Sequence, residues 1–349
     1  MLKVGIAGLR RGRGLLQIFH HHREARVVAV CDSVAERREE VGGEFGIPKT
    51  YAEFDDFLAA ELDVVVIATP APLHAAQSIQ ALEAGANVLS EVPAAWTLDE
   101  SAALAEAVRR TGRLYMMGEN VNFYHYIQEW KATIRAGELG QVFYAEAEYV
   151  HDCRKLMRDA EGRPTWRASM PPIYYCTHSL GPVLDILDDR CVSVLGMATG
   201  AHTEPELGAT DMEVGLFRTE QGRVIKILCG FSVTREPAMH WQVFYGTEGV
   251  LENRRAPGEE AKVFRAGEGQ LRAIAAEVSD PHAPAEALAG GHGTSEYYMV
   301  DRFIRAVIDG GESPIDVYRS LDFSTPGLCA HLSALQGGMP VEIPDYRTG

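Results

Sequence analysis

Residues 2–14 read LKVGIAGLRRGRG, an apolar run that ends in a turn rich in glycine and arginine. The run Leu2–Ala7 predicts a buried strand, and Leu15–His22 after the turn predicts a helix. A second apolar run, Arg26–Val30, leads to Asp32. Strand, glycine-rich turn, helix, strand and terminal acid is the order of a βαβ unit that binds a dinucleotide at its turn.

The glycine pattern departs from the usual G-x-G-x-x-G, because Arg10 and Arg13 stand where glycines are expected. A carboxylate at the end of the second strand accepts hydrogen bonds from ribose hydroxyls, which favours NAD over NADP. Whether Arg10 and Arg13 also admit NADP stays open. The residues predicted to form this part of the NAD site are Gly8, Leu9, Arg11, Gly12 and Asp32.

The alternation of strands and helices continues, and predicts a doubly wound parallel sheet in residues 1–122. Its further strands are expected at Asp63–Ala68, Asn87–Ser90 and Leu114–Met117, with helices at Val41–Phe45, Tyr51–Ala60, Leu73–Ala84 and Leu98–Thr111.

Residues 123–349 predict a substrate-binding α+β domain with a large, mostly antiparallel open sheet. The fold class is therefore α/β followed by α+β, a Rossmann domain and then a second domain. Residues 256–290, rich in Ala, Gly, Glu and Pro, are expected to form a surface excursion. The predicted strands are Gln141–Val150, Val192–Met197, Met212–Arg218, Arg223–Val233, Trp241–Gly246 and Val250–Glu252, and the predicted helices are Leu180–Leu187 and Thr294–Asp309.

Composition excludes several classes of partner. The net charge of -16 over 349 residues argues against nucleic acid and anionic membranes. No apolar run approaches the roughly 18 residues that span a bilayer. The chain opens on a strand pattern with no secretory signal, and its six cysteines are scattered, without a C-x-x-C pair. We therefore expect a cytoplasmic protein with reduced thiols and no metal site.

Two tyrosine–histidine pairs are candidates for proton transfer. Residues 171–185, PPIYYCTHSLGPVLD, place Tyr175 and His178 three apart at the start of a predicted helix, so both face one side. Tyr149 and His151 lie two apart at a strand end and also share a face. Phenol and imidazole together can move protons near neutral pH. The alternative is a packed tyrosine beside a helix-start histidine, with a surface strand end for the other pair.

The first domain resembles the Gfo/Idh/MocA oxidoreductase family. The resemblance rests on VGIAGL near the start, ATPAPLH at 68–74 and EVP at 91–93. The family usually has a lysine at the middle of the last motif, where it takes part in hydride transfer. Here that residue is Val92, which cannot carry a proton.

The longer resemblance, over nearly the whole chain, is to glycoside hydrolase family 109. Its motifs are LSEVPAAWTLDE (89–100), MMGEN (116–120), YVHD (149–152), TWR (165–167) and YCTHSLGP (175–182), with GHG, DVY and MPVEIPDY nearer the end. This branch also lacks the lysine. The resemblance implies an NAD-dependent glycosidase, typified by α-N-acetylgalactosaminidases.

That mechanism oxidises the sugar at C3, removes the C2 proton, eliminates the C1 substituent, adds water and returns the hydride. The resemblance gives catalytic roles to Tyr149, His151, Tyr175 and His178, without dividing acid from base. Further cofactor contacts are implied at Thr69, Pro70, His74, Glu91, Val92, Asn120 and Tyr175, and substrate contacts at Glu119, Trp166, Arg167, Tyr174 and His292.

Two other functions stay open: a sugar or cyclitol dehydrogenase, and a non-catalytic NAD-binding protein. Ala71 and Leu73 stand where this branch of the family commonly has tryptophans, and Ala238 stands where we expect an aromatic residue that contacts the sugar. The identity of the sugar is therefore left open. The expected partner is a small glycoside or sugar, and the family suggests a homo-oligomer, either a dimer or a tetramer.

Overall fold

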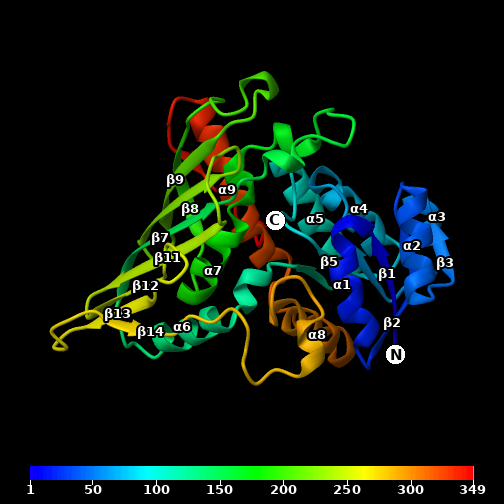
Figure 1. The fold of residues 1–349 in the computed structure, drawn as a ribbon, viewed down its shortest axis with the longest axis horizontal. Coiled ribbons are helices and arrows are strands. Elements are labelled where there is room, and N and C mark those ends of the chain that lie inside the picture. Colours follow the sequence, from blue (N-terminus) through cyan, green and yellow to red (C-terminus); the bar gives the residue numbers. More distant parts are fainter. Residues whose placement is uncertain (349) are drawn as a thin grey trace. The chain divides into compact units, whose positions relative to one another are not determined.

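The computed structural model describes residues 1–348 and divides into two compact units. The first unit holds residues 1–124 and 278–321, with the tail from Tyr346. The second unit holds residues 125–277 and 322–345. The sequence placed the whole of 123–349 in the second domain, whereas the segment 278–321 packs with the N-terminal unit. In Figure 1 that segment is the orange stretch that contains helix α8.

The first unit is built on a six-stranded sheet in the order β3-β2-β1-β4-β5-β6, and every neighbouring pair is parallel. This is the order of a dinucleotide-binding fold, so the predicted Rossmann sheet is confirmed. Parallel strands are covered on both faces, which explains why all four residues of β4 are fully buried. The strands are β1 (Leu2–Ala7), β2 (Ala25–Cys31), β3 (Lys49–Tyr51), β4 (Val64–Ile67), β5 (Asn87–Ser90) and β6 (Tyr115–Met117).

The helices of this unit include α8, which contacts α1 and the short 3₁₀ helix η2 (Asn120–Phe123). These contacts bring residues 278–321 into the unit. Helix α5 begins with a capping box, in which Thr97 and Glu100 satisfy each other's backbone N–H groups, and it ends before Gly112. The α-helices are α1 (Leu9–His21), α2 (Ala35–Phe45), α3 (Phe54–Leu58), α4 (His74–Glu83), α5 (Leu98–Thr111) and α8 (Ser295–Asp309), and the other 3₁₀ helices are η1 (Ala71–Leu73) and η7 (Ala285–Leu288).

The second unit is built on a nine-stranded sheet in the order β14-β13-β12-β11-β7-β10-β9-β8-β15. Only the central pair β7 and β10 is parallel among the described strands of this sheet, so the mostly antiparallel prediction is confirmed. The strands are β7 (Val142–Val150), β8 (Cys191–Ala198), β9 (Met212–Thr219), β10 (Val224–Gly230), β11 (Met239–Gly246), β12 (Gly249–Glu252), β13 (Ala261–Arg265), β14 (Arg272–Ile274) and β15 (Val341–Glu342).

Helix α7 (Thr177–Leu187) packs on β7, β11 and helix α6 (His125–Arg135). Helix α9 (Val317–Leu335) starts in the first unit and continues into the second. The remaining 3₁₀ helices are η3 (Arg154–Leu156), η4 (Trp166–Ser169), η5 (Pro172–Tyr175) and η6 (Pro205–Leu207).

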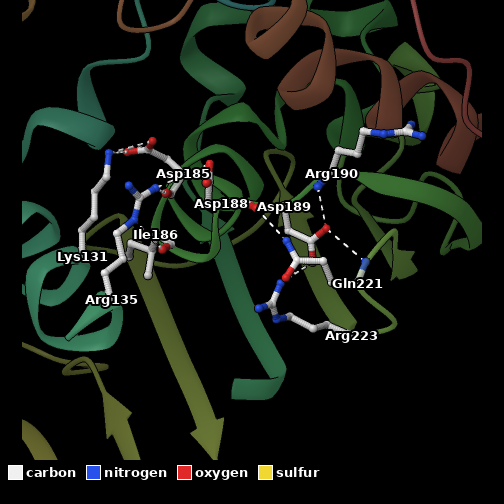
Figure 2. A network of polar contacts seen from close by, with 9 residues as sticks. All are labelled: Lys131, Arg135, Asp185, Ile186, Asp188, Asp189, Arg190, Gln221 and Arg223. Atoms are coloured by element: carbon white, nitrogen blue, oxygen red, sulfur yellow. Dashed lines mark hydrogen bonds and ion pairs between the residues drawn. The ribbon is translucent and has the colours of Figure 1, made fainter. Parts of the chain in front are cut away.

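Polar contacts fix the C-terminal end of α7, as Figure 2 shows. Arg135 of α6 donates to the carbonyl oxygens of Asp185 (2.7 Å) and Ile186 (3.3 Å), which lack partners within a helix that ends there. Lys131 binds the Asp185 carboxylate at 2.8 and 2.9 Å. Helix α7 is therefore held at its end as well as along its packed face.

Several elements differ from the predictions. Helix α2 begins at Ala35, six residues before the predicted start at Val41, and residues 256–290, expected as a surface excursion, add strands β13 and β14 to the second sheet. The predicted helix Tyr51–Ala60 is wrong at its start: Tyr51 ends strand β3, and α3 begins at Phe54. Helix α1 begins at Leu9, six residues before the predicted start at Leu15. A helix with glycines inside it is unfavourable by propensity alone. Gly12 is tolerated there because a Cβ at that position would lie 2.9 Å from Ile6 Cγ2, so close packing of helix on strand requires it.

Candidate active site

One edge of the first-unit sheet collects the residues predicted to bind the cofactor. Because all six strands are parallel, their C-terminal ends lie at one edge, where such sheets bind their ligands. Gly8 follows β1, Asp32 follows β2, and Thr69 lies just beyond β4. Glu91 and Val92 follow β5, and Glu119 and Asn120 lie just beyond β6.

The turn after β1 is held by the Asp32 carboxylate. Oδ2 accepts from the backbone N–H of Leu9 at 2.8 Å, and Oδ1 accepts from Val34 at 2.9 Å. Gly8 has a φ of 87°, and a Cβ there would lie 2.3 Å from the Ala68 carbonyl oxygen. Only glycine fits this turn. A short turn into a helix N-terminus, with a carboxylate on the second strand, suits the pyrophosphate and ribose of NAD.

His74 links the loops after β4 and β5. Nε2 lies 2.9 Å from the Thr69 carbonyl oxygen, and Nδ1 lies 2.9 Å from that of Pro93. The side chain is buried, and burial lowers the pKa of His74, although the two carbonyls oppose this. A neutral ring has a single N–H, so it donates to one of these carbonyls and packs against the other. Val92 is buried beside Pro93, and Pro70 is exposed.

Arg11 is bound by two carboxylates. Its Nε lies 2.9 Å from Glu91 Oε1, and its Nη2 pairs with Glu296, the second residue of α8. Glu296 also accepts from His292 Nδ1 at 2.9 Å and from the backbone N–H of Gly291 at 2.7 Å. These partners outweigh burial and lower the pKa of Glu296 to about 2. Sequence reasoning named Arg11, Glu91 and His292, but missed the carboxylate that joins two of them.

Glu119 and Asn120 are also buried. Glu119 Oε1 accepts from the backbone N–H of Val121 at 3.2 Å and thereby caps η2. A carboxylate used in this way positions the chain after β6, which carries Asn120.

The four predicted catalytic residues come together in the second unit. The Tyr149 hydroxyl lies 3.2 Å from His151 Nδ1. The rings of Tyr149 and His178 are 5.3 Å apart edge to face, those of Tyr175 and His178 are 5.2 Å apart, and those of Tyr149 and Tyr175 are 6.5 Å apart. Two phenols and two imidazoles thus form one group, which we call the Tyr–His cluster.

The fold explains why these residues meet. Tyr149 lies at the end of β7 and His151 lies just beyond it. Because the two residues are two apart in extended chain, both face the side of the sheet where α7 packs. Tyr175 ends η5, and His178 lies in the first turn of α7. Phe231 closes the cluster, with its ring 5.1 Å from Tyr149 and 5.8 Å from Tyr175.

His240 is a further member of the cluster that sequence reasoning missed. Strand β11 pairs with β7 so that His240 lies directly opposite Tyr149. The two rings stack with centroids 4.2 Å apart and planes at 27°. The His178 ring lies 6.1 Å away from that of His240. A spacing of 91 residues along the chain hides this contact, and the strand register creates it.

Burial favours a neutral His151, and the charges around the cluster act in both directions. Burial lowers the pKa of His151, and the nearby Arg167 lowers it further, while Glu236 and Asp152 raise it. Arg167 lies over the rings of Trp166 (4.4 Å) and Tyr175 (5.7 Å). Trp166 and Arg167 therefore adjoin the cluster.

Tyr174 points elsewhere. Its ring meets that of His331, with centroids 5.5 Å apart. His331 Nδ1 lies 2.7 Å from the buried Glu213 carboxylate, which also accepts from the backbone N–H of Ile173 at 3.0 Å. Burial and Glu213 raise the pKa of Tyr174. Tyr174 thus helps to fix η5, the element that presents Tyr175.

Three further findings concern metal-binding groups, cysteines and membrane spans in residues 1–348. No group of three or more His, Cys, Asp or Glu in this range could hold a metal ion. All six cysteines are free and buried. None of the described helices is long and apolar enough to cross a membrane.

Comparison with known proteins identifies the family. Residues 2–119 match the oxidoreductase family with an NAD-binding Rossmann fold, and residues 127–252 match the Gfo/Idh/MocA C-terminal domain. The chain belongs to the Gfo/Idh/MocA oxidoreductase family. The predicted NAD-binding domain is confirmed for this family member. Residues 280–349 match the C-terminal domain of glycosyl hydrolase 109, as the motifs predicted.

Curated proteins similar to this chain are named glycosyl hydrolase family 109 proteins. A glycosyl hydrolase family 109 protein of Solibacter usitatus is 26% identical over all of this chain and 89% of its own length. Another, from Shewanella amazonensis, is 28% identical over all of this chain and 86% of its own length.

Solved structures with this fold include sugar and cyclitol dehydrogenases. Levoglucosan dehydrogenase in complex with NADH and levoglucosan is 20% identical and superposes with a TM-score of 0.83 over 99% of both chains. Scyllo-inositol dehydrogenase from Lactobacillus casei, with bound NAD(H) and scyllo-inositol, is 16% identical, with a TM-score of 0.77 over 98% of this chain and 99% of its own. At these identities the likeness confirms the Gfo/Idh/MocA fold alone.

Proposed function

We propose that this Gfo/Idh/MocA enzyme is an NAD-dependent glycosidase that cleaves by transient oxidation of the sugar. The observation that carries the proposal is the Tyr–His cluster, in which the Tyr149 hydroxyl lies 3.2 Å from His151 Nδ1. The match of residues 280–349 to glycosyl hydrolase 109 supports it. So does Val92, because a buried valine cannot replace the lysine of the family's dehydrogenases.

The cofactor is held by the edge of the first-unit sheet. Gly8, Leu9 and Gly12 would hold the pyrophosphate, Asp32 would bind the ribose, and the loops at Thr69, Glu91 and Asn120 would contact the rest of the cofactor. When bound, NAD supplies reversible hydride transfer with the sugar carbon C3.

Proton transfer falls to the Tyr–His cluster. Oxidation at C3 acidifies the C2 proton, so a base of moderate strength suffices to remove it. A neutral His151 accepts the Tyr149 proton and makes that phenol a better base. His178, which is edge-on to both tyrosines, would protonate the departing C1 oxygen or activate the water that replaces it. Tyr175 contacts the sugar beside Arg167 and Trp166.

The expected substrate is a small glycoside. Trp166 offers an aromatic face for a sugar ring, and Arg167 offers donors for its oxygens. Ala71 and Ala238 stand where aromatic contacts are expected in this branch, so the proposal does not extend to N-acetylgalactosamine as the sugar.

The test is hydrolysis of a panel of nitrophenyl glycosides by the NAD-loaded enzyme in deuterated water. We expect product with deuterium at C2 and no net NADH. Tyr149→Phe should lower kcat about 100-fold, in line with loss of general-base catalysis. Tyr144→Phe is the matched control, because Tyr144 lies on the same strand and bonds Glu146 at 2.8 Å instead. Cleavage without exchange at C2 would exclude this mechanism.

A sugar or cyclitol dehydrogenase is the second candidate, favoured by the solved structures with this fold. It would form NADH in proportion to the sugar consumed. Binding of NAD without either reaction would leave a non-catalytic protein. Measurement of nitrophenol release together with NADH absorbance in the same panel separates the three outcomes.

A further inference from the structure

Glu296 is a fully buried carboxylate outside the sites that sequence reasoning named. It lies in the first turn of α8, where a negative charge is favoured by the helix dipole. It contacts Arg11, His292 and the backbone N–H of Gly291. Every residue involved belongs to the first unit.

Arg11 connects this carboxylate to the cofactor turn. It is the third residue of α1, directly after the turn at Gly8, and it also binds Glu91 at 2.9 Å. With carboxylates on both sides, the guanidinium is committed to internal contacts. Its contribution to NAD binding is therefore to fix the start of α1, since its charge is already neutralised.

We propose that Glu296 is a positioning residue for the NAD-binding turn: it holds Arg11, and through it the first turn of α1, in the geometry that the pyrophosphate requires. The same carboxylate binds the loop at 290–292, so Glu296 holds both this loop and the turn. The proposal rests on the NAD site proposed at Gly8–Gly12. It does not depend on glycosidase activity.

The chain offers a matched control for Glu296. Arg13, two residues after Arg11 on the same helix, pairs with Glu40 at 2.6 Å, but both side chains are exposed. An exposed ion pair contributes little. Glu296→Gln puts an amide NH2 against donors from Arg11 or Gly291, whereas Glu40→Gln disturbs only a solvated pair.

A second pair of variants reaches the carboxylate without removing it. A Cβ at Gly290 would lie 2.2 Å from Glu296 Oε2 and 2.9 Å from Ile18 Cδ1. A Cβ at Gly291 meets no atom within 4 Å. Gly290→Ala should therefore displace the Glu296 carboxylate, and Gly291→Ala should not.

The experiment measures the Kd of NAD and of adenosine for each variant, by calorimetry or competition NMR, with thermal unfolding as a check on folding. We expect Glu296→Gln and Gly290→Ala to raise the Kd of NAD about ten-fold. Adenosine, which lacks the pyrophosphate, should keep its Kd within about two-fold, and Glu40→Gln and Gly291→Ala should match the wild type.

Two results would overturn the proposal. One is wild-type NAD affinity in Glu296→Gln or in Gly290→Ala. The other is an equal loss of NAD and adenosine binding, which would show general disruption of the unit. Because neither measurement needs turnover, an inactive wild-type enzyme would count against the glycosidase and leave this test intact.

Discussion

His151 is the imidazole whose charge the fold biases. Burial lowers the pKa of His151 below its ordinary value of 6.5, and Arg167 adds to this. A lowered pKa means that the ring stays neutral until the pH falls below that ordinary value. If the neutral ring is the proton acceptor, kcat is constant near pH 7 and falls only below pH 6.5. The measurement is the acid limb of the kcat–pH profile.

Opposite charges near His151 give variants that shift this limb in opposite directions. Glu236 raises the pKa of His151, so Glu236→Gln should move the limb to lower pH. Arg167 lowers the pKa, so Arg167→Gln should move it to higher pH. NMR titration of the His151 ring checks both shifts independently of turnover. A shift of the same sign in both variants would contradict the assignment of the limb to His151.

Substitutions of His240 distinguish stacking of its ring on Tyr149 from proton transfer by its ring nitrogens. Its ring lies 4.2 Å from that of Tyr149 and nearly parallel to it, so it fixes the phenol that bonds His151. His240→Phe keeps an aromatic ring there and should retain kcat within about three-fold, whereas His240→Ala removes the stack and should lower kcat about ten-fold or more. Steady-state kinetics of both variants is the measurement. A large loss in His240→Phe would show that the ring nitrogens themselves take part.

Single residues show where prediction from sequence ends. Tyr149 with His151, and Tyr175 with His178, are close in the chain, so local periodicity predicts that each pair shares a face, and the structure brings both pairs into one cluster. His240 is far along the chain from Tyr149, and Glu296 is 285 residues from Arg11. Their contacts arise from strand register and helix packing, which no local pattern encodes.

At the scale of elements, α7 depends on a buried ion pair just beyond its end. Asp189 is almost fully buried, and its carboxylate binds Arg223 at 2.5 Å and the backbone N–H of Arg190 at 2.9 Å (Figure 2). Removal of one partner leaves the other charge buried and unpaired. Arg223→Met should lower the free energy of unfolding by about 3 kcal/mol, measured by urea denaturation.

The control for this pair is a neighbour on the surface. Arg190 also pairs with Glu220 at 3.0 Å, and the Glu220 side chain is more than half exposed. Glu220→Gln should change the free energy of unfolding by less than about 1 kcal/mol. Equal effects in Arg223→Met and Glu220→Gln would show that burial of Asp189 does not matter.

The elements themselves differ in how far sequence predicts them. Strands β1 and β5 and helix α5 have the predicted bounds, because each has a clear apolar pattern and distinct ends. Strand β3 was missed, since three residues at the sheet edge carry no periodic signal. The early start of α1 was missed because glycines suggest a loop, whereas Gly12 is required by packing of the helix on β1.

At the scale of the whole molecule, each of the two units has its own sheet. Each unit also contains cysteines, whose reactivity measures how readily that unit opens. Cys31 lies in the first unit beside Asp32, while Cys153, Cys176, Cys191, Cys229 and Cys329 lie in the second. Burial raises the pKa of the Cys31 and Cys153 thiols to about 11 and that of Cys329 to about 12. A thiol reagent at pH 8 should therefore label the native protein slowly, and label all six cysteines in denaturant.

NAD should protect these thiols unequally. A ligand that binds the folded first unit at about 100 times its Kd stabilises that unit by about 2.7 kcal/mol. Where labelling follows local opening, Cys31 should then react about 100-fold more slowly, and the five cysteines of the second unit should keep their rates. Mass spectrometry of labelled peptides measures each rate separately. Equal slowing of all six would show that the units open together, because a ligand on one unit would then stabilise the other by the same free energy.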